Sequence, residues 1–265
     1  MENEKQIIQG IWVGDELSLM EQLSIRSFLS NGHEYHLYVY QDVKNIPEGT
    51  VIKDGNEILS KDMIYTYMND AAAGSLSAFS NNFRFELLYK RGGYYVDTDV
   101  ICLKKFDFDD EIIIPMQVRP RKPNNGGPDG SAVITSFVLK FPKGSEVMRY
   151  AADRCHRLRK DVIEGKISWG LGPSTVEDFT RKYDLHDKTK PPSTFSPFHF
   201  EEILDRMLLP CNVDLLDLRR KSYGIHLFHE IWRREKIDKN KRYDPRSLYE
   251  QFKLLYDASS PTVPQ

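Results

Sequence analysis

The sequence lacks the segments that place a protein in a membrane or direct it out of the cell. Its apolar runs fall well short of the roughly 20 residues that a membrane-spanning helix needs. The first six residues, Met-Glu-Asn-Glu-Lys-Gln, have neither the basic start nor the apolar core of a signal peptide. We therefore expect a protein of the cytoplasm.

Cysteine is scarce, and neither sign of charge dominates. Cys102, Cys155 and Cys211 are odd in number and widely spaced, which argues against a disulfide framework and against a zinc site. Free thiols fit a reducing compartment. The net charge of −2 gives the chain no general attraction to nucleic acid.

What the sequence does contain is enough for a packed core. Its 265 residues are 40% hydrophobic and 12% aromatic, without an internal repeat or a low-complexity stretch. A chain of this length forms one large domain or a domain with an appendage. We predict a single domain over residues 1–265.

The first forty residues predict the start of a parallel sheet. Residues 7–14 have the pattern of a buried strand that ends at a glycine, and residues 35–40 that of a second strand. Between them, Ser18 and Glu21 are spaced as a capping box, which predicts a helix over residues 19–30. Strand, helix and strand in this order begin an α/β fold with a parallel sheet, and such sheets bind ligands at the carboxyl ends of their strands.

Further along, the patterns are less regular. Residues 57–74 have a helical pattern, residues 111–115 that of a strand stopped by Pro115, and residues 131–139 that of a longer apolar strand. Residues 117–130 hold three prolines and three glycines. A loop of this length in a compact domain is usually functional or disordered.

The segment that organises the chain is Ser80 to Ile101. It has the pattern of a helix that ends at Gly92 and Gly93, followed by a strand that leads into Asp97 and Asp99. Side chains two apart on an extended chain point the same way, so the two carboxylates repel each other. A divalent cation with oxygen ligands, Mg²⁺ or Mn²⁺, removes that conflict. A second Asp-x-Asp pair at residues 107–109 lacks this context, and we interpret it as a solvated loop.

This segment resembles the core signature of glycosyltransferases that carry a sugar-binding region with an Asp-x-Asp motif, the group related to α-1,6-mannosyltransferases and α-1,4-galactosyltransferases. The matching positions are Ser80, Arg84, Phe85, Leu88, Tyr89, Gly92, Gly93, Tyr95, Asp97 and Asp99. Asn81 departs from the signature, because the family usually has aspartate there.

The resemblance implies the GT-A fold of nucleotide-diphospho-sugar transferases, a Rossmann-like, mixed but mainly parallel sheet flanked by helices. It implies a nucleotide-sugar donor, most of all a UDP-sugar, together with Mn²⁺ or Mg²⁺. It assigns Asp97, Asp99 and Arg84 to catalysis. The donor contacts that it implies are Trp12, Ser80, Asn81, Arg84, Asp97, Thr98, Asp99 and Trp232.

A second segment carries the same resemblance. His226, Phe228 and Trp232 fit the His-x-(Trp/Phe)-x-x-x-Trp motif that closes the family's core. By this resemblance, His226 is the third protein ligand of the metal beside the two aspartates. His229 lacks a motif match and is expected to be structural. We expect residues 219–265 to close the site and residues 117–130 to form an acceptor loop.

Residues 219–246 hold ten basic and four acidic residues. Such a run is usually a solvated face, but it could also screen a diphosphate or touch an anionic membrane surface on the cytoplasmic side.

These patterns predict an enzyme that moves a sugar to a saccharide or glycolipid acceptor with retention of configuration, in surface polysaccharide or lipopolysaccharide synthesis. Two alternatives are a protein-modifying glycosyltransferase and a non-catalytic sugar-binding protein on a degenerate fold, which Asn81 would favour. A glycoside hydrolase fits poorly, because its two carboxyls stand about 5–10 Å apart on either side of the bond that is cut.

Overall fold

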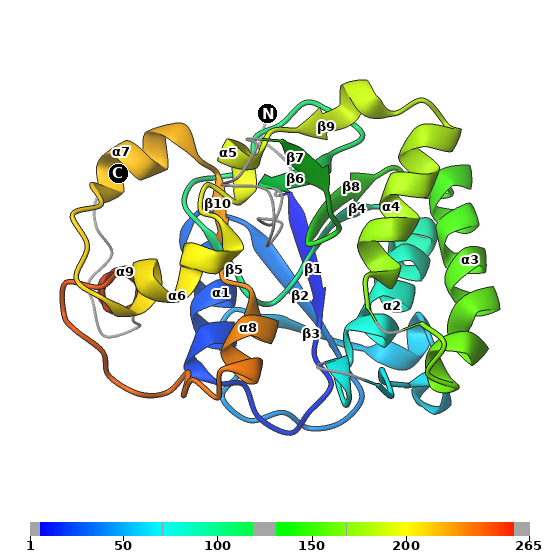
Figure 1. Ribbon diagram of the computed structural model, residues 1–265, viewed down its shortest axis with the longest axis horizontal. Helices are drawn as coiled ribbons and strands as arrows, with labels where there is room; N and C mark the ends of the chain where they lie inside the picture. The colour runs from blue at the N-terminus through cyan, green and yellow to red at the C-terminus, as the bar shows by residue number, and fades with distance from the viewer. Residues whose placement is uncertain (1–5, 70–71, 119–130, 168, 257–265) are drawn as a thin grey trace, which may run out of the picture.

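The computed structural model describes residues 6–69, 72–118, 131–167 and 169–256 (Figure 1). Its main sheet has five strands in the order β3-β2-β1-β4-β8. Their bounds are Val51–Asp54 for β3, Glu34–Val39 for β2, Ile7–Ile11 for β1, Gly93–Val96 for β4 and Val138–Phe141 for β8. The first four are parallel, and β8 runs antiparallel to β4. The predicted mixed, mainly parallel α/β sheet is confirmed.

The strand order reverses between β1 and β4. From β1 the chain moves outward to β2 and β3 and then returns to the other side of β1 as β4. In open α/β sheets, such a reversal opens a crevice at the carboxyl ends of the two strands. Trp12 follows β1 and Asp97 follows β4, so two of the predicted site residues lie at this switch point.

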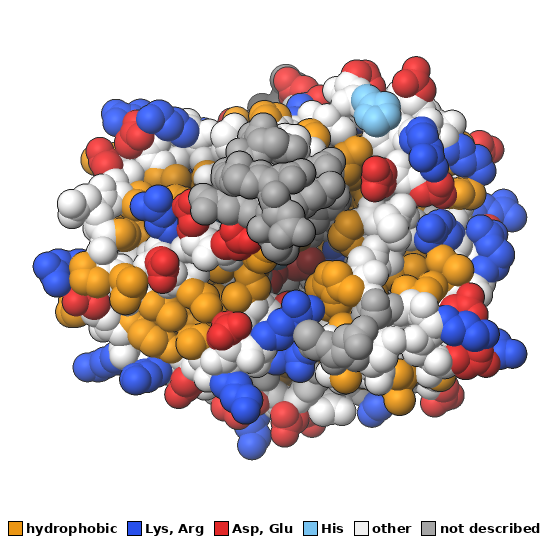
Figure 2. All heavy atoms as spheres, viewed as in Figure 1, with side chains coloured by type: hydrophobic (Ala, Val, Ile, Leu, Met, Phe, Trp, Pro, Cys, Tyr) orange, Lys and Arg blue, Asp and Glu red, His pale blue; other side chains and the backbone are white. Residues whose placement is uncertain are grey.

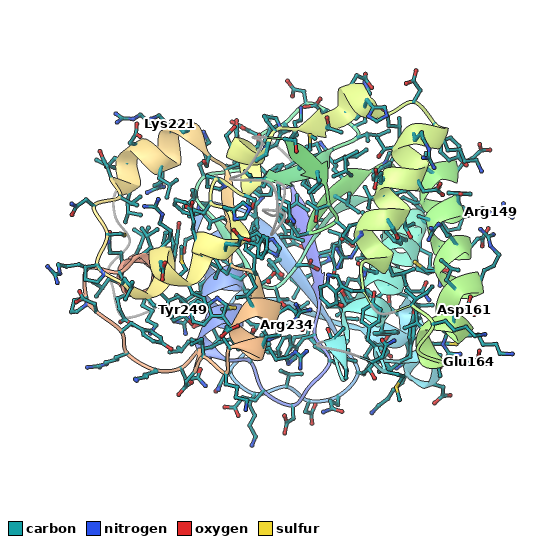
Figure 3. The ribbon with its side chains drawn as sticks, in the orientation of Figure 1. Arg149, Asp161, Glu164, Lys221, Arg234 and Tyr249 are labelled. Carbon is teal, nitrogen blue, oxygen red and sulfur yellow. The ribbon has the colours of Figure 1, made fainter. Side chains whose placement is uncertain are left out.

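Helices cover both faces of the sheet (Figure 1). Helices α2 (Ser77–Arg91), α3 (Glu146–Ile163) and α4 (Leu171–Lys182) share one core cluster with sheet residues such as Tyr38 and Leu139. Helix α1 (Leu19–Ser30) packs on the other face through Ile25 and Phe28. Arg149 and Asp161 on the outer side of α3, and Glu164 just after its end, point away from the molecule in Figure 3.

The C-terminal helices pack on the far side of α1. They are α6 (Ile203–Leu208), α7 (Leu215–Lys221), α8 (His229–Arg234) and α9 (Leu248–Tyr256). Met20 and Leu23 of α1 contact this layer in a third core cluster, whose largest member is Trp232. Helix α1 is therefore buried on two sides. Strand β10 (Gly224–His226) pairs antiparallel with β5 (Val100–Cys102) and joins this layer to the acidic turn.

A second, smaller sheet lies at one end of the main sheet. Its order is β7 (Ala132–Ile134), β6 (Ile114–Val118) and β9 (Thr189–Lys190). The short helix α5 (Pro192–Phe195) follows β9. Single turns of 3₁₀ helix are η1 (Gly55–Glu57), η2 (Lys61–Met63), η4 (His186–Lys188) and η5 (Phe200–Glu202).

Several local predictions are confirmed. Helix α1 covers residues 19–30 and starts at the capping box, where the Ser18 N–H donates to Glu21 Oε2 at 2.9 Å. Helix α2 ends at Gly92, which has a φ of 69°. A Cβ atom there would lie 2.4 Å from the Lys143 nitrogen, so the position requires glycine.

Three boundary predictions were wrong. In the described part of residues 57–74, the chain forms single 3₁₀ turns and irregular stretches instead of the predicted helix, and Tyr65 and Tyr67 pack into the core. Pro115 does not stop its strand: it lies within β6, where its carbonyl accepts from the Thr135 N–H. The strand predicted over residues 131–139 is split into β7 and β8, because the residues between them line the acidic turn.

Most of the predicted acceptor loop, residues 119–130, lies outside the described residues. Among the helices that the structure describes, none is long and apolar enough to cross a membrane.

Candidate active site

The acidic pair lies in a tight turn between β4 and β5. The Asp97 N–H donates to the Phe137 carbonyl at 2.9 Å, and the Val100 N–H donates back to the Asp97 carbonyl at 3.2 Å. The chain therefore turns at Thr98. The sequence pattern instead implies an extended chain through Asp97 and Asp99. The two carboxylates nevertheless lie close together. Strand β10, which pairs with β5, brings the His226 side chain to them.

Asp97 is held by helix α2 and by its own strand. Its Oδ1 accepts from Arg84 Nη2 at 2.7 Å and from the Tyr95 hydroxyl at 3.0 Å. The Arg84 side chain is 3% exposed, and it also donates to Ser80 Oγ at 2.9 Å and to the Ser136 carbonyl. Burial raises the pKa of Asp97, and the guanidinium of Arg84 opposes that rise.

Asp99 is held by the segment that follows β10. Its Oδ2 lies 3.4 Å from His226 Nε2 and accepts from the His229 N–H at 2.7 Å. Burial acts to raise the pKa of Asp99, but the charge of His226 and the hydrogen bonds from His226 and His229 outweigh it, so the pKa falls below its ordinary value. Asp99 therefore stays ionised in neutral solution.

His226 packs against two aromatic rings. The Phe137 ring stacks on the imidazole, with ring centres 4.2 Å apart and the two planes inclined by 15°. The centre of the Phe228 ring lies 4.1 Å from that of the imidazole. Phe228 has a φ of 55°, a left-handed conformation that is costly for a bulky residue. This turn also begins α8 and directs the His229 N–H at Asp99.

The three side chains fit a divalent cation. Asp97, Asp99 and His226 each offer a ligand atom, and these atoms lie within 4.8 Å of one another. Each carboxylate uses one oxygen for the hydrogen bonds above, and its second oxygen receives no hydrogen bond from the described residues. The His226 Nδ1 is buried and likewise lacks a partner in that part of the chain. Two carboxylates and an imidazole suit Mn²⁺ or Mg²⁺.

The other predicted donor contacts are divided between the site and the core. Ser80 touches Arg84, and Thr98 lies half-buried between the two aspartates. Asn81 is buried and accepts from Ser136 Oγ at 3.5 Å. Trp12 is half-buried, and its Nε1 has no partner among the described residues.

Trp232 is not at the surface of the site. It is fully buried, and its Nε1 donates to the Leu227 carbonyl at 3.0 Å. In this structure Trp232 therefore supports the turn between His226 and His229 from behind, and it does not face a ligand.

The start of α4 and the residues before it also pack beside the site. A Cβ atom on Gly172 would lie 2.1 Å from Asn81 Oδ1, so the start of α4 packs directly on α2. Before α4, the half-exposed Trp169 lies against Tyr67 and under the Arg234 guanidinium, 4.9 Å from the ring centre. Figure 2 shows a hollow in this face with acidic side chains at depth, and Figure 3 shows Arg234 beside it on α8.

Sequence reasoning missed Ser136 and Phe137, which carry no motif and reach the site only because β7 and β8 are split there. It also missed Lys239, which it placed on a solvated face. Lys239 pairs with the fully buried Glu21, which the sequence identified only as a capping residue.

The comparison with protein families agrees with this geometry. The family model described as glycosyltransferase sugar-binding region containing DXD motif matches residues 19–119. Over these residues, the chain therefore resembles the DXD sugar-binding region of glycosyltransferases. The matched range includes α1, the whole of α2, Arg84 and the acidic turn. The mainly parallel sheet with this turn at its switch point agrees with the predicted GT-A fold.

Solved structures with a similar backbone are distant in sequence. The PaToxG glycosyltransferase has 12% identity and a TM-score of 0.46, over 96% of this chain and 86% of its own. GlyE of Streptococcus pneumoniae TIGR4 has 13% identity and a TM-score of 0.44, over 95% of this chain and 61% of its own. The UDP-bound glycosyltransferase domain from the YGT toxin has 10% identity and a TM-score of 0.41, over 94% and 82%. No curated protein matches the sequence.

Proposed function

We propose that this glycosyltransferase moves a sugar from a UDP-sugar to a saccharide or glycolipid acceptor, with Mn²⁺ or Mg²⁺ held by Asp97, Asp99 and His226. The observation that carries the proposal is the convergence of the His226 imidazole, 127 positions after Asp99 and 129 after Asp97, on the acidic pair, with the ligand atoms within 4.8 Å. UDP is the nucleotide by resemblance to the family.

The residues of the chain divide the work of the transfer. A bound divalent cation would act as a Lewis acid on the diphosphate that leaves. Arg84 fixes Asp97 and the N-terminal part of α2, where Ser80 and Asn81 can meet the donor. Trp12, at the end of β1, offers an indole to the nucleotide on the other side of the switch point.

The reaction breaks the bond between the anomeric carbon and a diphosphate oxygen, and the electron pair stays on the diphosphate. A bond forms between that carbon and an acceptor hydroxyl oxygen, which gives up its proton. We propose retention of configuration with departure and attack on the same face, as the family resemblance implies. Holding donor and acceptor together provides the orientation that the reaction needs.

For the acceptor we propose a saccharide or glycolipid of surface polysaccharide or lipopolysaccharide synthesis, reached from the cytoplasmic side of a membrane. The support is the basic excess of residues 219–246. Part of this charge is used within the protein, since Lys221 pairs with Asp217 and Arg233 with Glu230. A membrane contact would rely on the charges that remain.

A panel of UDP-sugars, with and without Mn²⁺, tests the proposal through the release of free UDP. Metal-dependent release supports the transferase. Release of sugar from oligosaccharides without a nucleotide would instead show a hydrolase, and sugar binding without turnover a non-catalytic protein. Label transfer from the productive donor to saccharide, glycolipid and protein acceptors then separates the proposed acceptor from a protein substrate.

A further inference from the structure

A buried ion pair lies directly behind the donor site. Glu21, on the first turn of α1, is fully buried, and its Oε1 accepts from Lys239 Nζ at 2.5 Å. The Lys239 side chain is 17% exposed and belongs to the segment between α8 and α9. The two residues are far apart in the sequence, so the pair joins the beginning of the fold to its end.

Stability alone does not account for such a pair. Removing two charges from water is unfavourable, and the attraction between them often does no more than offset that cost. If the pair only stabilised the fold, two well-packed apolar residues would stabilise it equally well. The surroundings of the pair therefore indicate its role.

Lys239 lies near both ends of the proposed donor site, the metal end at Asp99 and the nucleotide end at Trp12. Its Nζ lies 3.4 Å from His229 Nε2, and because an ammonium can only donate, that nitrogen accepts. The backbone N–H of the same histidine donates to Asp99 Oδ2 at 2.7 Å. On its other side, Lys239 Nζ lies 5.8 Å from the centre of the Trp12 ring.

Glu21 extends the connection to the nucleotide half. Its other oxygen accepts from the Ser18 N–H at 2.9 Å and so fixes the start of α1, a few residues after Trp12. The Lys239 segment is itself held in place: Asn240 Oδ1 accepts from the Leu19 N–H at 2.9 Å, and the Tyr249 hydroxyl donates to the Lys239 carbonyl at 2.6 Å. Figure 3 shows Tyr249 on the same side of the molecule as Arg234 of α8.

We propose that Lys239, held by Glu21, is a positioning residue that couples the nucleotide end of the donor site at Trp12 to its metal end at Asp99. The inference rests on the proposed function. It predicts that the divalent cation and UDP bind cooperatively, because each ligand orders residues that the same ammonium holds. By linkage, the gain in UDP affinity on adding metal equals the gain in metal affinity on adding UDP.

Isothermal titration calorimetry with UDP, in saturating Mn²⁺ and in excess EDTA, measures this coupling. The variant is the double substitution Glu21→Gln with Lys239→Met, which removes both charges and leaves an amide oxygen for the Ser18 N–H. We expect the gain in UDP affinity from Mn²⁺ to fall by about 10- to 100-fold, as for other residues that hold metal ligands in place. Lys239→Arg, which keeps the cation, should recover part of the gain.

The matched control is Lys241→Met, an exposed lysine of the same segment, which should keep the wild-type gain. Urea unfolding of every variant separates a lost coupling from a lost fold. If the double variant does not fold, Lys239→Gln is measured in the same way and judged by the same criterion.

The outcomes are distinct. A wild-type protein that binds UDP equally with Mn²⁺ and with EDTA would contradict the proposed function itself. A wild-type protein with a clear Mn²⁺ gain, and a folded charge-free variant that keeps that gain in full, would overturn the role of Lys239 alone. Loss of the gain in the variant, with the gain kept in Lys241→Met, would support it.

Discussion

Arg84 Nη2 lies 2.7 Å from Asp97 Oδ1, and this contact joins helix α2 to the acidic turn. The guanidinium also holds Ser80 Oγ and the Ser136 carbonyl, so it connects three segments of the site. Its side chain lies 4.7 Å from the centre of the Tyr95 ring, which places a cation over an aromatic face. The site is therefore built around a buried positive charge before any ligand arrives.

Truncating this arginine should destabilise the protein strongly. Arg84→Ala leaves Asp97 without its counter-charge in a buried place, and we expect a loss of about 3–5 kcal/mol in the free energy of unfolding. Urea unfolding at pH 7.5 measures it. Arg181→Ala removes an exposed partner of Asp178 and serves as the control, with an expected loss under about 1 kcal/mol. Equal losses in the two variants would show that the Arg84 contact is not built as described.

Phe228 should matter for metal affinity more than for folding. Phe228→Ala removes a ring that packs on His226 at 4.1 Å and loosens the turn that carries the His229 N–H. We expect Mn²⁺ affinity to fall by about tenfold, measured by titration calorimetry.

The comparison for Phe228 is Phe108→Ala, which removes a half-buried ring in the Phe106, Phe195 and Tyr223 cluster, away from the acidic turn. Phe108→Ala should leave Mn²⁺ affinity unchanged. A similar fall in both variants would indicate a general loosening of the fold instead of a role at His226.

The sequence predicted the parts of the site that lie within one continuous segment. The helix with Arg84, the Gly92 break, the strand and the acidic turn follow one another along the chain, and each has a local signal. His226 was also predicted, because a motif marks it. The strand pairing that brings it to Asp99, His226 opposite Val100, could not be derived, since pairing between β5 and β10 has no signal in either strand.

Polar contacts between residues far apart in the sequence could not be predicted either, because neither partner carries a local signal of the contact. The run of charges over residues 219–246 predicts a solvated face, and only the packing of residues 236–243 against α1 turns Lys239 inward. Trp232 shows the opposite error. A family motif suggested a ligand contact, but its indole fills the third core cluster.

A buried histidine should make the stability depend on pH. His33 Nε2 accepts from the Phe106 N–H at 2.9 Å, so its proton is on Nδ1, which faces the Gln6 carbonyl at 3.1 Å. Burial lowers the pKa of His33 below its ordinary value of 6.5. The unfolded chain then binds a proton more readily than the folded one, and stability present above pH 6.5 is lost as the pH falls through and below that value.

We therefore expect the free energy of unfolding to decrease between pH 7.5 and pH 5.5, and to decrease less in His33→Gln. Each unit of difference in pKa corresponds to about 1.4 kcal/mol. Urea unfolding at the two pH values provides the measurement. His186→Gln, at an exposed histidine, should keep the wild-type dependence. An identical pH dependence in His33→Gln would remove His33 as its source.

The central claim is that Asp97, Asp99 and His226 hold one divalent cation, and electron paramagnetic resonance of Mn²⁺ titrated into the protein tests it most directly. We expect the wild-type chain to bind one Mn²⁺ and to quench the signal of the free ion in proportion. His226→Ala and Asp99→Ala should remain folded and lose that binding, by at least the about 100-fold at the upper end of what removing an outer-shell partner costs in metal affinity. Wild-type Mn²⁺ binding in both folded variants would contradict the account.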